Sequence, residues 1–144
     1  MRRKKRRAFT IIEVLIFITL ISFLFISVSY IMTATLRDTR SNEYKLVATH
    51  YADELKEWLR GEKEDDWNNF ITHEGSYCFN STILEWPSSG SCSGYINDSY
   101  DVFQRSVKLT KDSANQMTVN IQVVWNEAGG TKTVKNDTVF TVWE

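Results

Sequence analysis

One acidic residue, Glu13, lies inside a long apolar segment. It is the only charged residue between Ala8 and Leu36. Placing a carboxylate at the centre of a membrane costs about 2.5–3.5 kcal/mol, so such a residue is expected to have a function and a charged partner. The chemistry that we expect from Glu13 is therefore charge pairing with a cation. The alternative is that Glu13 lies near the membrane interface, where its charge is tolerated without a function.

The chain has two cysteines, Cys78 and Cys92. Outside the cytoplasm, two cysteines in one small domain are expected to form a disulfide. This disulfide would close a loop of about fifteen residues, worth about 3 kcal/mol in the chain-entropy model. In a reducing compartment both would remain free thiols. A zinc site is a poor alternative, because His50 and His73 do not have the spacing of zinc ligands.

No other group of residues has the pattern of a catalytic or cofactor site. The sequence contains no phosphate-binding loop, no nucleophile motif and no paired histidine ligands. We therefore expect no catalytic residues, no cofactor and no metal, and we predict that the protein is not an enzyme.

The basic residues are concentrated at the N-terminus. The net charge is −1, from 17 basic and 18 acidic residues, but residues 2–7 alone supply six of the basic ones. The remaining 11 basic residues stand against 18 acidic ones, a net charge of −7. With this negative charge, the rest of the chain has no evident basic surface that could bind nucleic acid, and no nucleic-acid partner is expected.

The apolar segment from Ala8 to about Leu36 predicts a membrane-spanning helix. Residues 14–36 carry no charge, and about 20 apolar residues suffice to cross a bilayer. A helix that is apolar on all sides has no polar face that could be exposed to water, which favours a location in the membrane. The cations before the helix are expected to keep the N-terminus in the cytoplasm. A secretory signal peptide would have a shorter apolar core, whereas a simple signal anchor is not excluded by length.

The residues around Glu13 resemble a known processing motif. Basic residues 2–7, followed by Ala8 and the sequence FTIIEV, resemble the prepilin cleavage motif of type IV pilins and type II secretion pseudopilins. The resemblance implies that a membrane-embedded aspartyl peptidase, prepilin peptidase, cuts between Ala8 and Phe9 and methylates the new Phe9 amine. It also implies that Glu13 acts in assembly by neutralising the Phe9 amine of a neighbouring subunit. The family usually has glycine before the cut, so Ala8 is expected to slow processing.

The same resemblance implies a structural subunit, a minor pilin or pseudopilin, of a type IV pilus or a type II secretion-like filament. Its partners would be other pilin or pseudopilin subunits, prepilin peptidase, the inner-membrane assembly platform, and the cell membrane before assembly. The chain would cross the cytoplasmic membrane once, with its N-terminus inside and its head outside, and then join a cell-surface or periplasmic filament. The alternatives are a tip-located adhesin or DNA-uptake pilin, and a signal-anchored extracytoplasmic protein that never polymerises.

A weaker resemblance concerns the subtype. Features at the end of the predicted helix and in the C-terminal part look like V-type minor pilins and I-type pseudopilins. They are Ala48, Ala52, Glu54, Glu57, Arg60, a V-x-I-x-V-V-W strand, a Gly-Gly turn and Trp143. Much of this pattern is what any half-buried sheet would show.

The segment after the apolar one predicts that the helix continues. Apolar residues at spacings of three and four form one helical face, namely Tyr44, Val47, Tyr51, Leu55 and Trp58. No glycine or proline lies between Phe9 and Arg60, and Gly61 is the expected C-terminal stop. We therefore divide the chain into a leader (1–8), an apolar half-helix (9–36), an amphipathic half-helix (37–61) and a globular head (62–144).

Alternating apolar and polar residues predict strands in the head. The alternation covers Phe103 to Leu109 and Met117 to Trp125, and a third stretch, rich in valine and threonine, ends in VFTVWE. These stretches predict a three-stranded antiparallel sheet that covers the apolar helix face, an α+β, pilin-like fold. A fourth strand from residues 76–86 is left open as an alternative, because the pattern there does not place it. Trp125 is expected in the core, and Trp86 is the candidate for an exposed contact.

Overall fold

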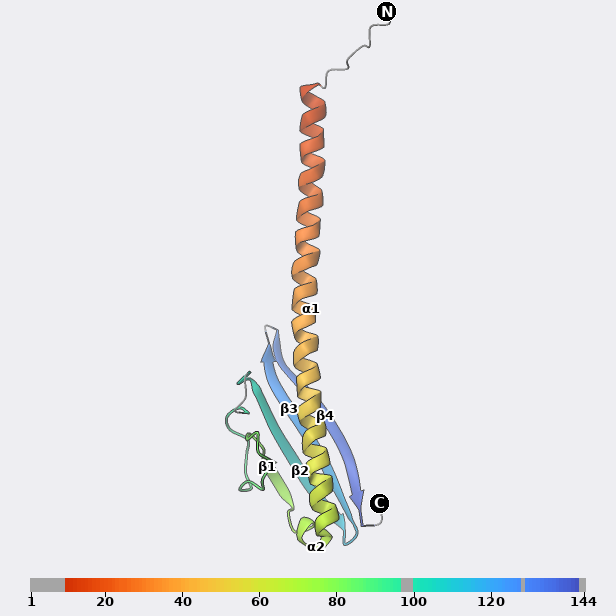
Figure 1. Ribbon diagram of the computed structural model, residues 1–144, viewed down its shortest axis with the longest axis vertical. Helices are drawn as coiled ribbons and strands as arrows, with labels where there is room; N and C mark the ends of the chain where they lie inside the picture. Colours follow the sequence, from red (N-terminus) through yellow and green to blue (C-terminus); the bar gives the residue numbers. More distant parts are fainter. Residues whose placement is uncertain (1–9, 97–99, 128, 143–144) are drawn as a thin grey trace, which may run out of the picture. The chain divides into compact units, whose positions relative to one another are not determined.

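The computed structural model of the chain describes residues 10–96, 100–127 and 129–142. In chain order, its elements are α1 (Ile11–Asp65), α2 (Trp67–Phe70), β1 (Gly75–Cys78), β2 (Phe103–Ser113), β3 (Gln116–Glu127) and β4 (Gly130–Thr141) (Figure 1). One long N-terminal helix and a four-stranded antiparallel sheet confirm the predicted α+β class. The chain divides into two compact units, Met1–Ser41 and Asn42–Glu144, and α1 contributes residues to both.

In the first unit, α1 is predominantly apolar and contains no glycine or proline. Its serine and threonine hydroxyls donate to backbone carbonyls one turn earlier, as in the bonds from Ser22 to Ile18 and from Thr33 to Ser29. These bonds satisfy the polar side chains within the helix itself. Apart from Ile21, the side chains from 11 to 40 are largely exposed. The helix therefore forms here without burying its apolar surface in the described fold.

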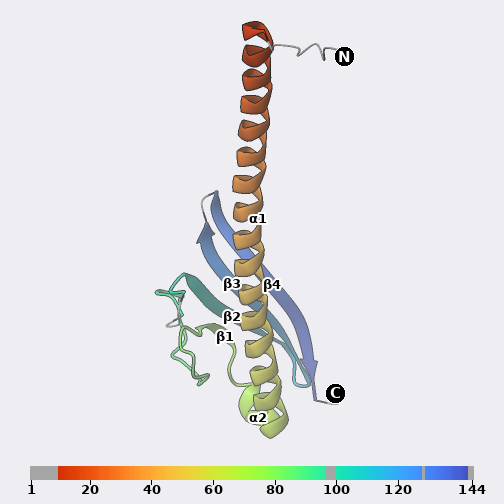
Figure 2. The same ribbon diagram turned by 45° about the horizontal axis from the view of Figure 1, so that its top comes forward.

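In the second unit, α1 packs on one face of the sheet (Figure 2). The fully buried residues of this part of α1 are spaced by four, three and four, namely Ala48, Ala52, Leu55 and Leu59. The other residues of the predicted apolar face are half-buried and flank this row, namely Tyr44, Val47, Tyr51 and Trp58. The two alanines are fully buried, and such small side chains allow packed elements to approach closely.

The end of α1 differs from the prediction. Gly61 does not stop the helix, which continues to Asp65. A Cβ at position 61 would meet no atom within 4 Å, so packing does not require glycine there. Lys63 holds the added turn, because it is 6% exposed and its ammonium lies 5.8 Å from the centre of the Phe140 ring. A tertiary contact thus extends the helix past the residue that local preference favours as its end.

The sheet has the strand order β1-β2-β3-β4, and each neighbouring pair is antiparallel. The three predicted strands correspond to β2, β3 and β4, and the predicted three-stranded sheet was therefore too small by one strand. β1 has only four residues and begins with Gly75, which leaves too short an alternation to identify. The outer edge of β1 is covered by a later segment, in which the Gly90 N–H donates to the Ser76 carbonyl at 2.9 Å.

Alternate residues of β2 and β3 face α1 and form the core. The apolar ones are Phe103, Val107 and Leu109 from β2, and Met117, Val119, Ile121, Val123 and Trp125 from β3. The prediction that Trp125 lies in the core is confirmed. The residues between these positions point to the opposite face, so the sheet has an apolar face toward α1 and a mostly polar face away from it.

Candidate functional site

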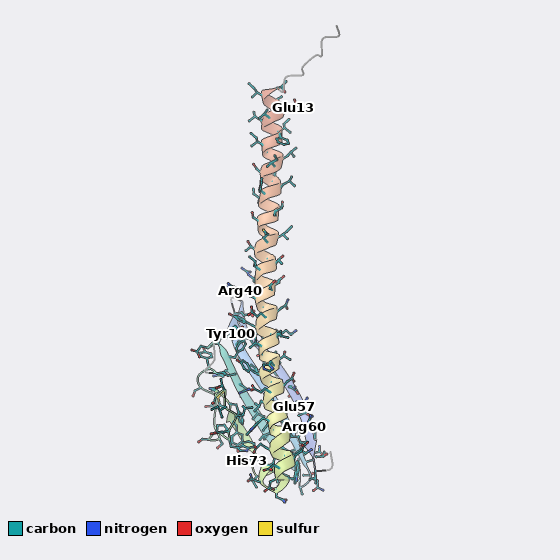
Figure 3. All side chains as sticks on the ribbon, in the orientation of Figure 1. Glu13, Arg40, Glu57, Arg60, His73 and Tyr100 are labelled. Atoms are coloured by element: carbon teal, nitrogen blue, oxygen red, sulfur yellow. A yellow bond between two sulfur atoms is a disulfide. The ribbon has the colours of Figure 1, made fainter. Side chains whose placement is uncertain are left out.

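Glu13 lies in the first turn of α1, which begins at Ile11. Its backbone N–H donates to the Thr10 carbonyl at 3.1 Å, and Figure 3 shows its side chain at the N-terminal end of the helix. The positive end of the helix dipole favours a negative charge in this position. The neighbouring side chains of Ile12 and Val14 are apolar and exposed. Glu13 is thus a carboxylate on an otherwise apolar helical surface.

The predicted cleavage and methylation site, Ala8 and Phe9, lies outside the described residues. The cut between them, the methylation of Phe9 and the pairing of Glu13 with a Phe9 amine therefore stay predictions. Their support comes from the sequence of this segment and from the surface of the helix that follows it.

The helix that follows Glu13 has the length and the composition of a membrane span. An 18-residue window of α1 has a mean hydropathy of 2.7, and none of it is buried in the fold. Large apolar side chains are exposed all around this part, including Phe17, Phe23 and Phe25, which point in different directions at 3.6 residues per turn. Each square ångström of such surface costs about 25 cal/mol in water. This surface suggests membrane anchoring.

The predicted disulfide between Cys78 and Cys92 is present. Cys78 is the last residue of β1, and we call the residues between the two cysteines, 79–91, the cysteine loop. The Nδ2 of Asn80 donates to the carbonyls of Ser93 and Gly94 at 2.9 and 3.0 Å, and so fixes the two ends of the loop together. Among the described residues, no three His, Cys, Asp or Glu side chains are grouped so that they could hold a metal ion.

Arg105 is a buried charged residue that was not among the predicted site residues. Its side chain is 0% exposed, and its Nε and Nη2 donate to the carbonyls of Phe79 and Ser81 at 3.2 and 3.0 Å. Its Nη1 donates to the Tyr51 carbonyl at 3.2 Å and to Glu54 Oε2 at 2.8 Å. Arg105 therefore connects α1 to the start of the cysteine loop.

The burial of the Arg105 charge is compensated in part by Glu54. Burial lowers the pKa of Arg105, whereas the hydrogen bond that Arg105 donates to Glu54 and the negative charge of Glu54 act in the opposite direction. An arginine guanidinium stays protonated in proteins, so the side chain remains a cation. A signal for this role was in the sequence, because Arg105 occupies an inward position of β2 between Phe103 and Val107. An arginine at such a position is buried only when it is paired.

Trp86 is packed against the core and is not the exposed contact that we predicted. Its Nε1 donates to Glu62 Oε2 at 2.8 Å, and its ring stacks on that of His73 with 3.9 Å between the ring centres. It also lies 5.2 Å from the ring of Trp58. The prediction was wrong because the cysteine loop turns this side chain inward. The exposed apolar residue of the loop is Ile83, at 69%.

The residues that resemble those of V-type minor pilins and I-type pseudopilins make structural contacts within the fold. Ala48 and Ala52 lie at the contact between α1 and the sheet, and Glu54 pairs with Arg105. Arg60 pairs with Glu57 at 3.1 Å on the exposed side of α1 (labelled in Figure 3). Trp143 lies outside the described residues. These contacts do not distinguish a minor pilin from a pseudopilin.

The comparisons with known proteins agree with the motif around Glu13. The family model described as the prokaryotic N-terminal methylation motif matches residues 3–29, which include the predicted cut and the first part of α1. A search of curated proteins finds no match, and neither does a search of solved structures. The motif suggests assembly with other pilin subunits. Together with the long helix and the antiparallel sheet, it supports a type IV pilin-like protein that is processed by prepilin peptidase.

Proposed function

We propose that the chain is a minor pilin or pseudopilin, a structural subunit without enzymatic activity that is built into a filament through residues 9–36. One observation carries the proposal. Glu13 is the only charged residue of an apolar, exposed helical surface, and it lies within a segment that matches the N-terminal methylation motif. The chain is anchored in the cytoplasmic membrane with its head outside, and the inner-membrane assembly platform moves it into the filament.

The chemistry of the proposed cut explains why Glu13 is needed. Cleavage between Ala8 and Phe9 removes the six cations of residues 2–7 and creates a positive amine on Phe9. This amine lies four residues before Glu13, which is about one turn of a helix. When apolar helices pack together in a filament, both charges leave water, and pairing between subunits offsets the cost of desolvation.

Pairing between different subunits also sets the geometry of the filament. The Glu13 of one copy binds the Phe9 amine of the next copy, which is a head-to-tail contact. Contacts of this kind produce an open helical assembly when they do not close into a ring. A single polar pair in an apolar interface also fixes the axial register of the helices, as buried polar residues do in coiled coils.

The first test is the chemical state of the N-terminus in a host that has prepilin peptidase. Mass spectrometry of the purified chain is expected to find N-methylated Phe9 as the first residue. Ala8→Gly is expected to increase the cleaved fraction, because glycine is the usual residue before the cut. An intact Met1 in that host, with cleavage of another prepilin in the same cells as the control, would contradict the proposal.

The second test separates cleavage from assembly. Glu13→Ala is expected to leave cleavage intact but to reduce incorporation into sheared filaments at least about tenfold, because a charge left unpaired out of water costs several kcal/mol. Ile12→Ala, which changes an apolar neighbour, is the matched control and is expected to be incorporated. Normal incorporation of the Glu13→Ala chain would remove the assembly role of this carboxylate.

A further inference from the structure

A polar groove lies on the face of the sheet that points away from α1. Its floor is formed by outward-facing residues of three strands, namely Ser106, Lys108, Asn120, Gln122, Lys135 and Asp137. One wall is formed by Gly90, Ser91 and Cys92. The groove has a volume of about 480 Å³, within the range of about 300–1,000 Å³ that is usual for ligand sites. The site is independent of Glu13 and of the helical surface used for assembly.

The wall of the groove is held in place by several bonds. The disulfide joins Cys92 to Cys78 at the end of β1, and the Gly90 N–H donates to the Ser76 carbonyl at 2.9 Å. From β2, the Nε2 of Gln104 donates to the carbonyls of Cys92 and Gly94 at 3.4 and 3.0 Å. A wall fixed in this way reduces the ordering that a ligand must impose when it binds.

The charges in the groove differ from those of the head as a whole. Residues 62–144 contain six basic and twelve acidic residues. Lys108 and Lys135 both face the groove, together with one acid, Asp137, which accepts a hydrogen bond from Asn120 at 2.9 Å. The groove therefore has one net positive charge in an acidic head.

The two remaining lysines of the sheet lie on its other face. Lys111 is paired in register with Met117, and Lys132 is paired with Trp125. Both partners are core residues, and directly paired residues project from the same face of a sheet. The outward-facing lysines of the described strands are thus the two in the groove.

We propose that this groove binds an acidic oligosaccharide, a sugar chain that carries carboxylates. The ammonium groups of Lys108 and Lys135 supply charge-assisted hydrogen bonds to carboxylates. The hydroxyls of Ser76, Ser91 and Ser106 and the amide of Gln122 supply donors and acceptors for sugar hydroxyls. These groups come from several strands, so the ligand lies across the sheet.

A peptide fits the groove less well. Two common modes of peptide binding add a strand to a free sheet edge or place apolar side chains in a groove. The edge of β1 beside the groove is already covered by residues 89 and 90. The apolar residues that line the groove are Tyr77, Val107 and Ile121, and all three are buried on the α1 side of the sheet. They contribute backbone, not apolar side chains, to the floor.

Calorimetry on the full chain in nonionic detergent micelles tests the proposal with three probes. Trigalacturonate carries a carboxylate on each sugar, galactotriose is its neutral counterpart, and triglutamate is a peptide with the same net charge as trigalacturonate at neutral pH. We expect saturable binding of trigalacturonate, at least about tenfold tighter than binding of either other probe. Failure to bind trigalacturonate, or equal affinity for triglutamate, would overturn the proposal.

Paired variants place the binding in the groove. Lys108→Ala combined with Lys135→Ala is expected to weaken trigalacturonate binding at least about tenfold. Lys111→Ala combined with Lys132→Ala removes the same number of charges from the opposite face of the sheet, and it is expected to leave the affinity unchanged. Both variants change exposed residues and are expected to fold. If the Lys111→Ala and Lys132→Ala double variant weakens binding as much as the groove variant does, the binding is non-specific attraction and the assigned site is wrong.

Discussion

Phe23 and Phe103 are the same residue type in opposite surroundings. Phe23, in the first unit, is 70% exposed, whereas Phe103, in the second unit, is 0% exposed. The ring centre of Phe103 lies 5.6–5.9 Å from those of Tyr44, Tyr51 and Trp125. The second unit therefore uses its apolar surface to hold itself together. The first unit keeps its apolar surface available for a membrane or for other subunits.

The two units also satisfy their polar side chains in different ways. In the first unit, Ser29 donates to the Phe25 carbonyl at 2.9 Å, one turn earlier in the same helix. In the second unit, the partners of Arg105 lie 24 to 54 positions away along the chain. Bonds of the first kind form wherever the helix forms. Bonds of the second kind exist only in the folded head, so substitutions there are expected to change its stability.

The largest expected effect is the loss of a buried aromatic ring. Phe103→Ala is expected to lower the free energy of unfolding of the second unit by about 3–5 kcal/mol, because it leaves a cavity among packed rings. Phe23→Ala is the matched control and is expected to change it by less than about 0.5 kcal/mol. Urea unfolding of the full chain in detergent, followed by tryptophan fluorescence, measures both, since all five tryptophans lie in the second unit. Equal losses would contradict the division between the units.

Removal of the disulfide is expected to have the next largest effect. Cys78→Ser combined with Cys92→Ser is expected to lower the free energy of unfolding by about 3 kcal/mol, because the unfolded chain loses a closed loop. The same urea titration measures it. A reducing agent is expected to destabilise the original chain but not the double variant, and an equal response of both would mean that the reagent acts elsewhere.

Arg105→Ala is expected to lower the free energy of unfolding by about 2–3 kcal/mol, because it leaves carbonyl groups near the cysteine loop without a charged donor. The figure is below that of a fully buried ion pair, since Glu54 is 39% exposed. Arg60→Ala breaks an exposed pair with Glu57, and its effect is expected to stay below about 0.5 kcal/mol. Urea midpoints that are the same for both variants would show that Arg105 does not hold the loop.

The smallest expected effect is a gain in stability. Gly61→Ala is expected to raise the free energy of unfolding by about 0.5–1 kcal/mol, because position 61 is helical and a Cβ there meets no other atom. Gly75→Ala is the control of opposite sign, since Gly75 has a φ of +132° and alanine is strained there. Thermal unfolding measures both shifts. No gain at position 61 would mean that the helix ends there, as the sequence alone suggests.

Features that depend on neighbouring residues were predicted well from the sequence. They include the apolar helix that contains Glu13, the antiparallel strands β2 to β4 and the inward position of Trp125. Each is encoded by a periodicity within a short window of the chain. The disulfide followed from the presence of only two cysteines, Cys78 and Cys92, and from an expected extracytoplasmic location.

Features that depend on contacts between distant residues required the fold. The sequence does not identify Glu54 as the partner of Arg105, and it does not show that Trp86 turns inward toward His73. The contact of Lys63 with Phe140 extends α1 beyond its local stop. The polar groove likewise exists only when strands far apart in the chain are placed in register. A short window of sequence contains the preference of each segment, but these contacts depend on which segments meet and on which face, and that is set only when the whole core packs.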